Sequence, residues 1–367
     1  MSRPTRKLVI DGRRLVSGRT GVGRYLECLL LEWARSGLPG EQVLVALADP
    51  SGIDLVPIVK GLTAKVVAPY LPGLLWERFG LSQLLDKNDL LFAPTNLVPW
   101  GWNGATVLVM FDALQELRPN DFSYLLRLRF QARYRKSLQR AQRVIVPSSA
   151  TARDLISVYG VPPGHIAVIY PAADRSFSPL PSDHPDVVLA RKTVGLSDSP
   201  FFLFVGKKSR RRNVAAIQTA FDHRMDRFPD HFLVFVGEHA SHPVLNSKVI
   251  EAGHVSEPVL RGLMASATAL LYPSELEGFG LPIVEAMAAG CPVITLKRDA
   301  LIEAGGDGPL YLESADPRLL ERAMMLTATD PEARRVRVQA GLEAASRYSV
   351  EEFASTVKRE LQRALNA

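Results

Sequence analysis

Two glutamates with seven residues between them, Glu277 and Glu285, form the clearest chemical pattern in the chain. Gly278 and Gly280 follow the first glutamate, and glycines in such a turn let the backbone approach a ligand closely. Pro282 is typical of the first turn of a helix, whose free N–H groups and dipole attract a phosphate or a hydroxyl oxygen. Carboxylates are good acceptors for the paired hydroxyls of ribose and hexose. The pattern therefore predicts a site for a nucleotide sugar.

The stretch from Glu277 to Val293 resembles the Glu-x7-Glu motif of retaining family-4 glycosyltransferases, together with the strand that follows it. Those enzymes have the GT-B fold, which is two Rossmann-like domains with the donor bound mainly to the second. The resemblance implies that Glu285 holds the ribose hydroxyls and that Glu277 contacts the donor sugar. It also implies that main-chain amides line the sugar and the phosphate, namely those of Gly278, Phe279, Gly280 and Leu281.

A cationic loop follows the apolar residues 201–205 in the same half of the chain. The segment from Gly206 to Asn213 resembles the family's Gly-Arg-x-x-x-x-Lys-Asn sequence, with Lys207 at the Arg position and Arg212 at the Lys position. The resemblance implies that both cations neutralise the diphosphate, although exchanging Arg and Lys changes the geometry of the contact. The other basic side chains of the loop are expected to be solvated rather than to bind the ligand; they are Lys208, Arg210 and Arg211.

The segment Gly253–Glu257 lies between these two elements, where the family usually contacts the base through main-chain groups. We assign this contact to Val255 and expect His254 to be exposed. In the first half, Gly21 and Gly23 follow a first strand and a loop, and they would let N–H groups face a phosphate or an acceptor. Their placement resembles the family's N-terminal Gly-rich loop.

Residue 111 departs from the family pattern, because Phe111 stands where many members carry the histidine of a His-Asp pair. That histidine usually borders the donor sugar and the acceptor, so its replacement leaves the acceptor side open and allows an inactive relative. Asp112 is a candidate for the acceptor side, and capping of a helix is the alternative role. Together with Glu277, Lys207 and Arg212, it completes the set of side chains expected nearest the reaction.

Short apolar runs alternate with amphipathic segments, which predicts parallel sheets covered by helices. Strands are expected at residues 7–10, 42–48, 89–93, 106–111, 143–147, 167–170, 201–205, 232–236, 269–272, 292–296 and 310–312. Helices are expected at residues 23–35, 124–140, 213–227, 281–288, 317–327 and 350–365. A passage rich in proline and serine, residues 170–183, separates two such series.

The predicted fold class is therefore α/β with the GT-B arrangement: two Rossmann-like domains whose parallel sheets face a central cleft. We place an acceptor-side domain at residues 1–178 and a nucleotide-sugar domain at residues 179–349. The final helix, about residues 350–367, can pack back on the first domain.

The overall composition limits the partners. A net charge of +6 favours an anionic partner, but no zinc finger, RRM signature or basic zipper supports nucleic acid. No apolar stretch approaches the ~18 residues of a membrane span, so we expect a cytoplasmic protein. Residues 124–143 mix seven basic residues with apolar ones. They predict either peripheral contact with an anionic membrane or a solvated helix packed by its apolar stripe.

The predicted function is transfer of a sugar from a nucleoside-diphosphate sugar, with GDP-mannose as the favoured donor, to a saccharide or lipid-linked saccharide hydroxyl. The family implies retention of configuration. No Asp-x-Asp motif is present, and the two cysteines give no metal cluster, so neither a metal nor another cofactor is expected. The alternatives are a sugar-nucleotide epimerase and a degenerate, non-catalytic sugar-nucleotide-binding protein.

Overall fold

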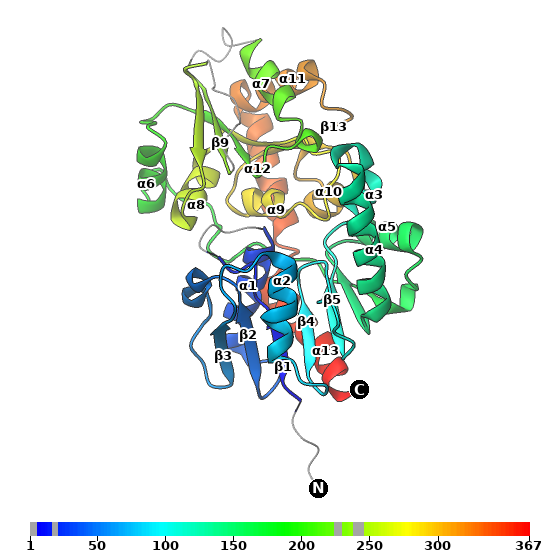
Figure 1. The fold of residues 1–367 in the computed structure, drawn as a ribbon. Coiled ribbons are helices and arrows are strands. Elements are labelled where there is room, and N and C mark those ends of the chain that lie inside the picture. Colours follow the sequence, from blue (N-terminus) through cyan, green and yellow to red (C-terminus); the bar gives the residue numbers. More distant parts are fainter. Residues whose placement is uncertain (1–5, 17–20, 224–229, 238–245) are drawn as a thin grey trace. The chain divides into compact units, whose positions relative to one another are not determined.

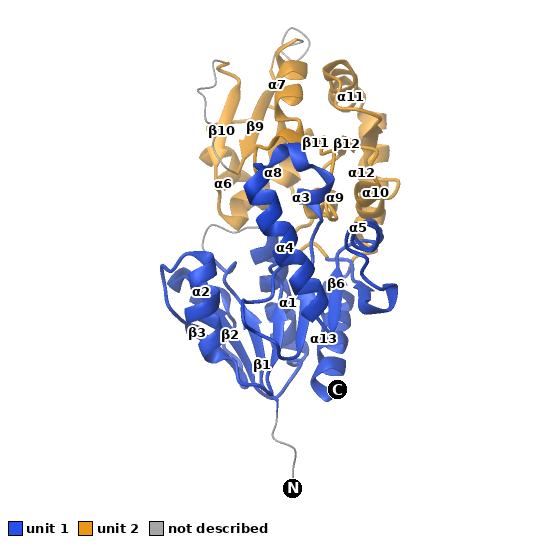
Figure 2. Ribbon diagram, turned by 45° about the vertical axis from the view of Figure 1, so that its right-hand side comes forward, with its two compact units in different colours: residues 1–171, 349–367 blue, residues 172–348 orange. Residues whose placement is uncertain are grey.

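The computed structural model describes residues 6–16, 21–223, 230–237 and 246–367 of the chain. It divides into two units (Figure 2): unit 1 comprises Met1–Pro171 and Ser349–Ala367, and unit 2 comprises Ala172–Tyr348. The chain thus leaves unit 1 after Pro171, inside the proline- and serine-rich passage and before the boundary at residue 178 that the sequence suggested.

Unit 1 contains a seven-stranded parallel sheet with the order β3-β2-β1-β4-β5-β6-β7 (Figure 1). Its strands are β1 (Leu8–Asp11), β2 (Val43–Leu47), β3 (Leu62–Val66), β4 (Leu90–Ala93), β5 (Thr106–Val109), β6 (Arg143–Val146) and β7 (Ile166–Val168). The central strands β1, β4 and β5 are buried throughout, which explains their continuous apolar sequences.

Helices cover both faces of this sheet. They are α1 (Gly21–Ser36), α2 (Gly73–Phe79), α3 (Leu114–Leu117), α4 (Tyr124–Arg140), α5 (Ser149–Tyr159) and α13 (Val350–Asn366). Helices α2, α4 and α5 pack on the face that carries Val9 and Leu91. On the other face, Trp33 of α1 lies beside Phe92 and donates a hydrogen bond of 2.9 Å to the carbonyl of Ala354 in α13. The C-terminal helix therefore belongs to the core of unit 1.

Unit 2 contains a six-stranded parallel sheet with the order β10-β9-β8-β11-β12-β13. Its strands are β8 (Phe201–Val205), β9 (Phe232–Val236), β10 (Val249–Gly253), β11 (Ala269–Tyr272), β12 (Val293–Leu296) and β13 (Leu310–Leu312). Its helices are α6 (Pro185–Thr193), α7 (Val214–Asp222), α8 (Glu257–Ser266), α9 (Leu281–Ala288), α10 (Asp299–Gly305), α11 (Pro317–Thr329) and α12 (Pro331–Ala345).

Alternate residues of β8 enter different cores, as the two-residue period of a strand requires. Phe202 and Phe204 pack against α7 and α11, whereas Phe201 and Leu203 pack on the side of α6, α8 and α9. The helix expected at residues 213–227 runs from Val214 to Asp222, and residues 224–227 of that prediction lie outside the described part of the chain.

Each sheet reverses its strand order once. The reversal lies between β1 and β4 in unit 1 and between β8 and β11 in unit 2. Ligands of open α/β sheets bind beyond the carboxyl ends of the strands at such a point. The loops that follow β8 and β11 are therefore the first place to look for a site in unit 2.

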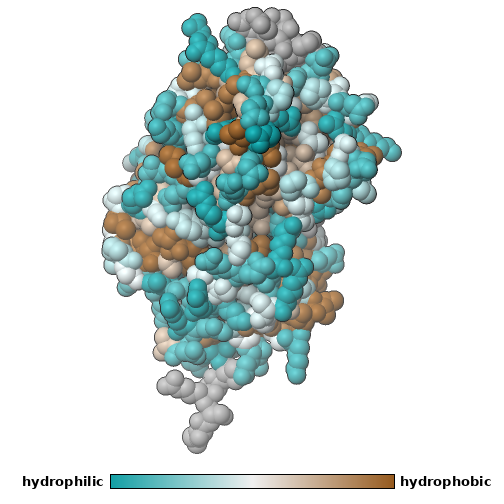
Figure 3. Space-filling model, turned by 180° about the vertical axis from the view of Figure 1, so that it is seen from behind, coloured by the Kyte–Doolittle hydropathy of each residue, from teal (hydrophilic) through white to brown (hydrophobic). Residues whose placement is uncertain are grey.

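The surface seen in Figure 3 is mainly hydrophilic, with apolar residues in separate patches. Among the residues that the structure describes, no helix is long and apolar enough to cross a membrane.

Candidate donor site

The loops after β8 and β11 are tied together at the point where the strand order reverses. The amide of Glu275 donates to the carbonyl of Arg211 at 2.8 Å. The side-chain amide of Asn213 donates to the carbonyl of Pro273 at 2.9 Å. The cationic loop and the loop that begins the Glu-x7-Glu motif thus form one structure.

Glycines let these loops approach each other closely. Gly206 has φ +133°, and a Cβ built on it would lie 2.3 Å from Nη1 of Arg212. Gly237, at the end of β9, has φ +128°, and a Cβ there would lie 2.4 Å from the carbonyl oxygen of Gly206. Side chains at either position would force the Arg212 guanidinium or the backbone to move. Glycine at residue 206 therefore leaves the space that the Arg212 guanidinium occupies, and glycine at residue 237 leaves space for the Gly206 backbone.

The Glu277 carboxylate is the centre of the cluster. Its Oε1 accepts hydrogen bonds from the hydroxyl of Tyr272 at 2.8 Å, the hydroxyl of Ser274 at 2.9 Å and Nε of Arg212 at 3.0 Å. Arg211 forms a further ion pair with the same oxygen. The side chain of Glu277 is only 11% exposed. Such a carboxylate is held in a single orientation.

The contacts of Glu277 determine its protonation state. Burial alone would raise the pKa of Glu277, but the charges of Arg212 and Arg211 outweigh it and lower the pKa from 4.5 to about 2. The same cluster raises the pKa of Arg212, because Tyr272 and Glu277 overcome the opposing effect of its burial. At neutral pH Glu277 is therefore an anion that accepts hydrogen bonds and cannot supply a proton.

Helix α9 begins directly after this loop. Its N-cap is Gly280, with φ +114°, so no side chain caps the N-terminus of the helix. Glu285 is the fifth residue of α9 and is 1% exposed. The ring of Phe279 is buried and stands edge-on to Tyr348, with the centroids 5.2 Å apart. Only main-chain atoms of Phe279 are thus suited to contact a ligand.

The basic side chains of the cationic loop differ in exposure, and two of them are less exposed than predicted. Lys207 and Arg210 are exposed, as a solvated loop requires, but Arg211 and Lys208 are not. The side chain of Arg211 is 14% exposed and pairs with Glu277. Lys208 is 13% exposed, pairs with Glu251 and lies 4.2 Å from the ring centroid of Phe235. The prediction that these two side chains are solvated was therefore wrong, because neighbouring loops and strands supply buried partners that the sequence does not display.

The expected base contact follows β10. Gly253 ends that strand with φ +64°, and its carbonyl accepts from the amide of Gly237 at 2.8 Å. Val255 is half-buried against the core of unit 2, whereas His254 is exposed, as expected. The hydrogen bond joins the end of β10 to the end of β9, beside the cationic loop.

The first-half candidates lie in unit 1. Helix α1 begins at Gly21, so Gly21 and Gly23 are in its first turn; Gly21 is exposed and Gly23 is buried. Asp112 accepts a hydrogen bond of 3.1 Å from the amide of Leu114, the first residue of α3. The sequence offered helix capping as the alternative role for Asp112, but the N-cap of α3 is Ala113, so Asp112 forms a turn directly before the helix instead.

The residue at the family's histidine position is packed by aromatic rings. The amide of Phe111 donates to the side chain of Asn96 at 2.8 Å. Its ring stands edge-on to Tyr25 of α1, with the centroids 5.1 Å apart, and Tyr25 also contacts Phe353 of α13 at 4.9 Å. Phe111 therefore packs against Tyr25, the residue of α1 that also contacts α13.

Comparison with known proteins identifies the family. A family model described as "Glycosyltransferase Family 4" matches residues 19–177, and one described as "Glycosyl transferases group 1" matches residues 189–343. The two matches cover unit 1 and unit 2 in turn. The chain belongs to glycosyltransferase family 4.

Relatives of this family-4 chain include bacterial mannosyltransferases. The "Serotype-specific mannosyltransferase WbdA" of Escherichia coli is 25% identical over 357 residues, which cover 88% of this chain and 42% of WbdA. The "O-antigen chain mannosyltransferase B" of Escherichia coli is 25% identical over 231 residues, 59% of each chain. The family-4 chain therefore spans about two fifths of WbdA, the longer of these two relatives.

Solved structures show the same GT-B fold. WaaG, "a glycosyltransferase involved in lipopolysaccharide biosynthesis", has a TM-score of 0.74 at 15% identity, with 96% of this chain and 99% of WaaG covered. Anabaena Alr3699/HepE in complex with UDP and glucose has a TM-score of 0.71 at 19% identity, with 98% and 99% covered. The fold is thus shared over nearly the whole chain.

The family-4 chain also has a charged cluster that the sequence did not reveal. Asp11, at the end of β1, accepts from Arg13 and from Thr95 at 3.0 Å. Glu77 of α2 pairs with both Arg13 and Arg133, the second of which belongs to α4. The cluster lies where the strand order of unit 1 reverses, between β1 and β4. In the sequence, only the position of Asp11 and Arg13 at the end of the first strand could have pointed to this cluster.

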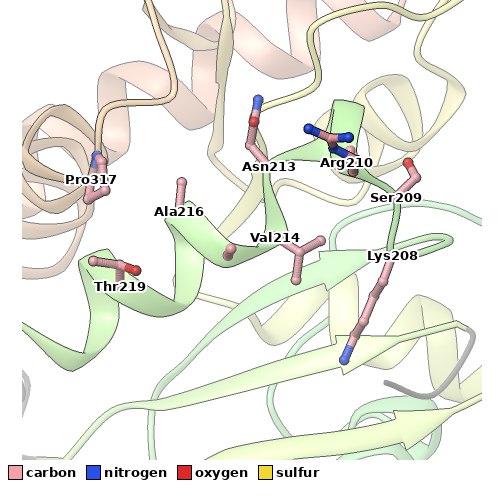
Figure 4. Close-up of a pocket in the computed structure, with 9 residues that line it drawn as sticks. Lys208, Ser209, Arg210, Asn213, Val214, Ala216, Thr219 and Pro317 are labelled. Atoms are coloured by element: carbon pink, nitrogen blue, oxygen red, sulfur yellow. The ribbon is translucent and has the colours of Figure 1, made fainter. Parts of the chain in front are cut away.

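A cavity of about 600 Å³ borders the cationic loop on another side (Figure 4). It is lined by Lys208, Ser209, Arg210, Asn213, Val214, Ala215, Ala216, Thr219 and Pro317. In Figure 4 Lys208 points away from Arg210 and Asn213, toward the strands. None of the predicted donor residues is among these lining residues, and none of the lining residues has a carboxylate to hold hydroxyl groups. This cavity therefore does not coincide with the residues predicted to bind the donor.

Proposed function

We propose that this family-4 glycosyltransferase moves a sugar from a nucleoside-diphosphate sugar to a hydroxyl of a saccharide or a lipid-linked saccharide. The proposal rests on the cluster of charged residues in unit 2 where the strand order reverses, between β8 and β11. In this cluster the ionised Glu277 is held in place by Arg211 and Arg212. It lies just before the N-terminus of α9, which no side chain caps.

The charges of the cluster suit a diphosphate. Arg211, Arg212 and the exposed Lys207 give three positive charges, and Glu277 removes one, so a net +2 faces a diphosphate that carries about two negative charges. The N-terminus of α9 adds a partial positive charge. A fixed positive field of this kind stabilises the charge that develops on the leaving diphosphate, and such stabilisation is often the main source of an enzyme's rate enhancement. In this proposal no metal ion is required.

The carboxylates take separate roles. Glu277 accepts hydrogen bonds from hydroxyls of the donor sugar, because its lowered pKa keeps it ionised. Glu285, on α9, accepts from the ribose hydroxyls. The leaving phosphate oxygen takes the proton of the acceptor hydroxyl, and the sugar keeps its anomeric configuration, as the resemblance to retaining family-4 enzymes implies. Relatives named mannosyltransferases make GDP-mannose the first donor to test.

A panel of nucleotide sugars tests the proposal, read first by thermal shift and then by turnover with saccharide acceptors. One donor should stabilise the protein, and calorimetry should show that Glu285→Ala abolishes its binding. Glu332→Ala, which removes a carboxylate on α12 that pairs with the exposed Arg335, is the matched control. Unchanged donor affinity in Glu285→Ala would remove the ribose assignment.

Turnover distinguishes the remaining outcomes. Lys207→Ala and Arg212→Ala should each lower kcat by roughly a hundredfold or more. Activity should persist in EDTA, and a strict requirement for a divalent cation would contradict the proposed mechanism. Interconversion of the donor sugar without an acceptor would indicate an epimerase, and binding without any turnover would indicate a non-catalytic protein.

A further inference from the structure

Trp100 is the exposed exception among the four tryptophans of the chain. It is 65% exposed, whereas Trp33, Trp76 and Trp102 are at most 9% exposed. Tryptophan has a large apolar side chain that is highly buried on average. The core of unit 1 therefore does not account for Trp100, and neither does the donor cluster, which belongs to unit 2.

A tight turn holds Trp100 at the surface. The amide of Trp102 donates to the carbonyl of Pro99 at 3.2 Å, which places Trp100 and Gly101 at the two central positions of a β-turn. Gly101 has φ +87°, the left-handed conformation that the second central residue of a type II turn requires. Pro99 and Trp102 are both buried, so the turn presents its corner, with Trp100, to solvent.

Both sides of this turn are anchored in unit 1. Before it, the amide of Val98 donates to the hydroxyl of Ser137 in α4 at 2.9 Å. After it, Nε1 of Trp102 donates to the hydroxyl of Thr106, the first residue of β5, at 3.0 Å. The backbone that carries Trp100 is therefore fixed before any ligand arrives, and such preorganisation lowers the entropic cost of binding.

Polar side chains lie beside the exposed ring. Helix α4, at the surface of unit 1 (Figure 2), buries Tyr134, Ser137 and Leu138 in its second half. Its Lys136 is exposed, and the ammonium group lies 5.9 Å from the ring centroid of Trp100. Asn103, directly after the turn, is exposed as well. An aromatic ring with an ammonium group beside it and a side-chain amide next to the turn is thus open to solvent.

This arrangement suits a sugar ring. One face of a pyranose consists of C–H groups, which pack on the negatively polarised face of an aromatic ring. The hydroxyls at the rim of the same pyranose can accept from Lys136 and exchange hydrogen bonds with Asn103. Since the groups around the ring are polar, a ligand that carries hydroxyls matches them better than acyl chains do.

The turn lies away from the edge of the sheet at which ligands of open α/β sheets bind, which is formed by the carboxyl ends of the strands. Thr106 is at the amino end of β5. Ser137 is in the last turn of α4, the helix that leads into the amino end of β6. A sugar on Trp100 is therefore not the one that reacts.

We propose that Trp100, Asn103 and Lys136 form a binding platform for a saccharide chain, separate from the donor site. The Trp100 platform holds a sugar remote from the reacting hydroxyl. This second contact raises the effective concentration of the chain end at the enzyme and so favours long acceptors. The choice of a saccharide rests on the proposed function, in which the acceptor is a saccharide.

Affinity electrophoresis of the full chain tests the platform without donor or turnover. Native gels contain soluble mannan, dextran or galactan, and the retardation gives a Kd for each polysaccharide. At least one of them should retard the wild type. Trp100→Ala should raise that Kd by about tenfold or more through the lost aromatic contact. Trp100→Tyr keeps an aromatic ring and should recover most of the affinity.

Tyr124→Ala is the matched control. Tyr124 is also 65% exposed, and Arg127 lies 5.5 Å from its ring centroid, much as Lys136 lies by Trp100. This variant should leave the Kd unchanged. Trp100 is also its own reporter, because the other three tryptophans are buried. Bound polysaccharide should reduce acrylamide quenching of the wild type, and this protection should vanish in Trp100→Ala.

Three outcomes would overturn the proposal. The first is that none of the polysaccharides retards the wild type, and the second is an equal Kd in Trp100→Ala. The third is flotation with phosphatidylglycerol vesicles that Trp100→Ala abolishes while no polysaccharide binds, which would assign the ring to lipid. Failure of these measurements leaves the proposed function standing, whereas polysaccharide binding without any sugar transfer would remove the proposed function and keep the platform.

Discussion

Glu277→Gln separates the charge of the central carboxylate from its shape. Glutamine has nearly the same volume and keeps a carbonyl oxygen that can accept from Tyr272 and Ser274. It removes the negative charge that Arg211 and Arg212 share. Both guanidinium groups, each 14% exposed, then lie beside each other with no anion between them.

The expected loss of unfolding free energy follows from the pKa of Glu277. The pKa of Glu277 falls from 4.5 to about 2 in the folded chain. At about 1.36 kcal/mol per pKa unit, the ionised form stabilises the fold by about 3 kcal/mol at pH 7. Because the folded pKa is the lower one, this stability is present above pH 4.5 and is lost as the pH falls toward about 2. At pH 3 the same linkage leaves about 1.4 kcal/mol.

Denaturant unfolding of the wild type and of Glu277→Gln measures this difference. All four tryptophans belong to unit 1; they are Trp33, Trp76, Trp100 and Trp102. Tryptophan fluorescence therefore follows unit 1, whereas far-UV circular dichroism follows both units. The variant should shift the dichroism transition to lower denaturant, and the difference in unfolding free energy should shrink between pH 7 and pH 3.

Glu275→Gln is the matched control on the same loop. Glu275 pairs with Arg298, and their side chains are 27% and 32% exposed, so the loss should be at most about 1 kcal/mol. Two results would refute the reasoning about Glu277. The first is a loss no larger than that of Glu275→Gln, and the second is a loss that is the same at pH 7 and at pH 3.

Three further substitutions test local features. Gly206→Ala should destabilise unit 2 by at least about 1 kcal/mol, because a φ of +133° strains a residue with a Cβ and the Arg212 guanidinium would have to shift away from it; a normal dichroism transition would contradict this. Tyr25→Phe should keep or raise the unfolding free energy, by up to about 1 kcal/mol, because the buried Tyr25 hydroxyl has no hydrogen-bond partner among the residues that the structure describes; a clear loss, followed by tryptophan fluorescence, would refute it. Phe111→His should cost unit 1 about 1 kcal/mol through the lost aromatic contact with Tyr25, and an unchanged fluorescence transition would count against that contact.

The strands that the sequence predicted are those with buried apolar runs. Strands β8, β9, β11 and β13 have the expected bounds, and the other predicted strands differ by one or two residues at their ends. The two strands that were missed, β3 and β10, are edge strands of their sheets. Alternate residues of β3 are exposed and most of β10 is half-buried. An edge strand is exposed on one side, so its sequence need not be continuously apolar.

The predicted helices α4, α9 and α11 bury apolar residues in the cores of their units. The helices α2, α3, α5, α6, α8, α10 and α12 were not among those predicted. Helix α12 was missed because the residues it buries are small: Gly341, Ala344 and Ala345. Small residues allow close packing, but they give little hydrophobic periodicity to detect. Its N-cap, Asp330, accepts from the amide of Ala333 at 2.9 Å and would have been a better guide than hydrophobicity.

The candidate site was predictable only in part. The glutamates and glycines of the motif have fixed spacing and so indicate a ligand, but the five basic residues from Lys207 to Arg212 look alike in sequence. A short 3-10 helix, Arg210–Arg212, turns Arg211 and Arg212 toward Glu277 and leaves Arg210 exposed. Which basic side chain binds an internal carboxylate depends on this turn, and the identity of the residues alone does not encode it.

Phe111 shows how packing changes the meaning of a departure from a family pattern. By sequence it is a missing histidine, which leaves the acceptor side open. In the structure its ring contacts Tyr25, and Tyr25 contacts Phe353, four residues after Ser349, where the chain re-enters unit 1. An aromatic ring at residue 111 therefore helps to fasten α13 to α1. Because this packing is a sufficient reason for an apolar ring, the absence of histidine is not by itself an argument that the transferase is inactive.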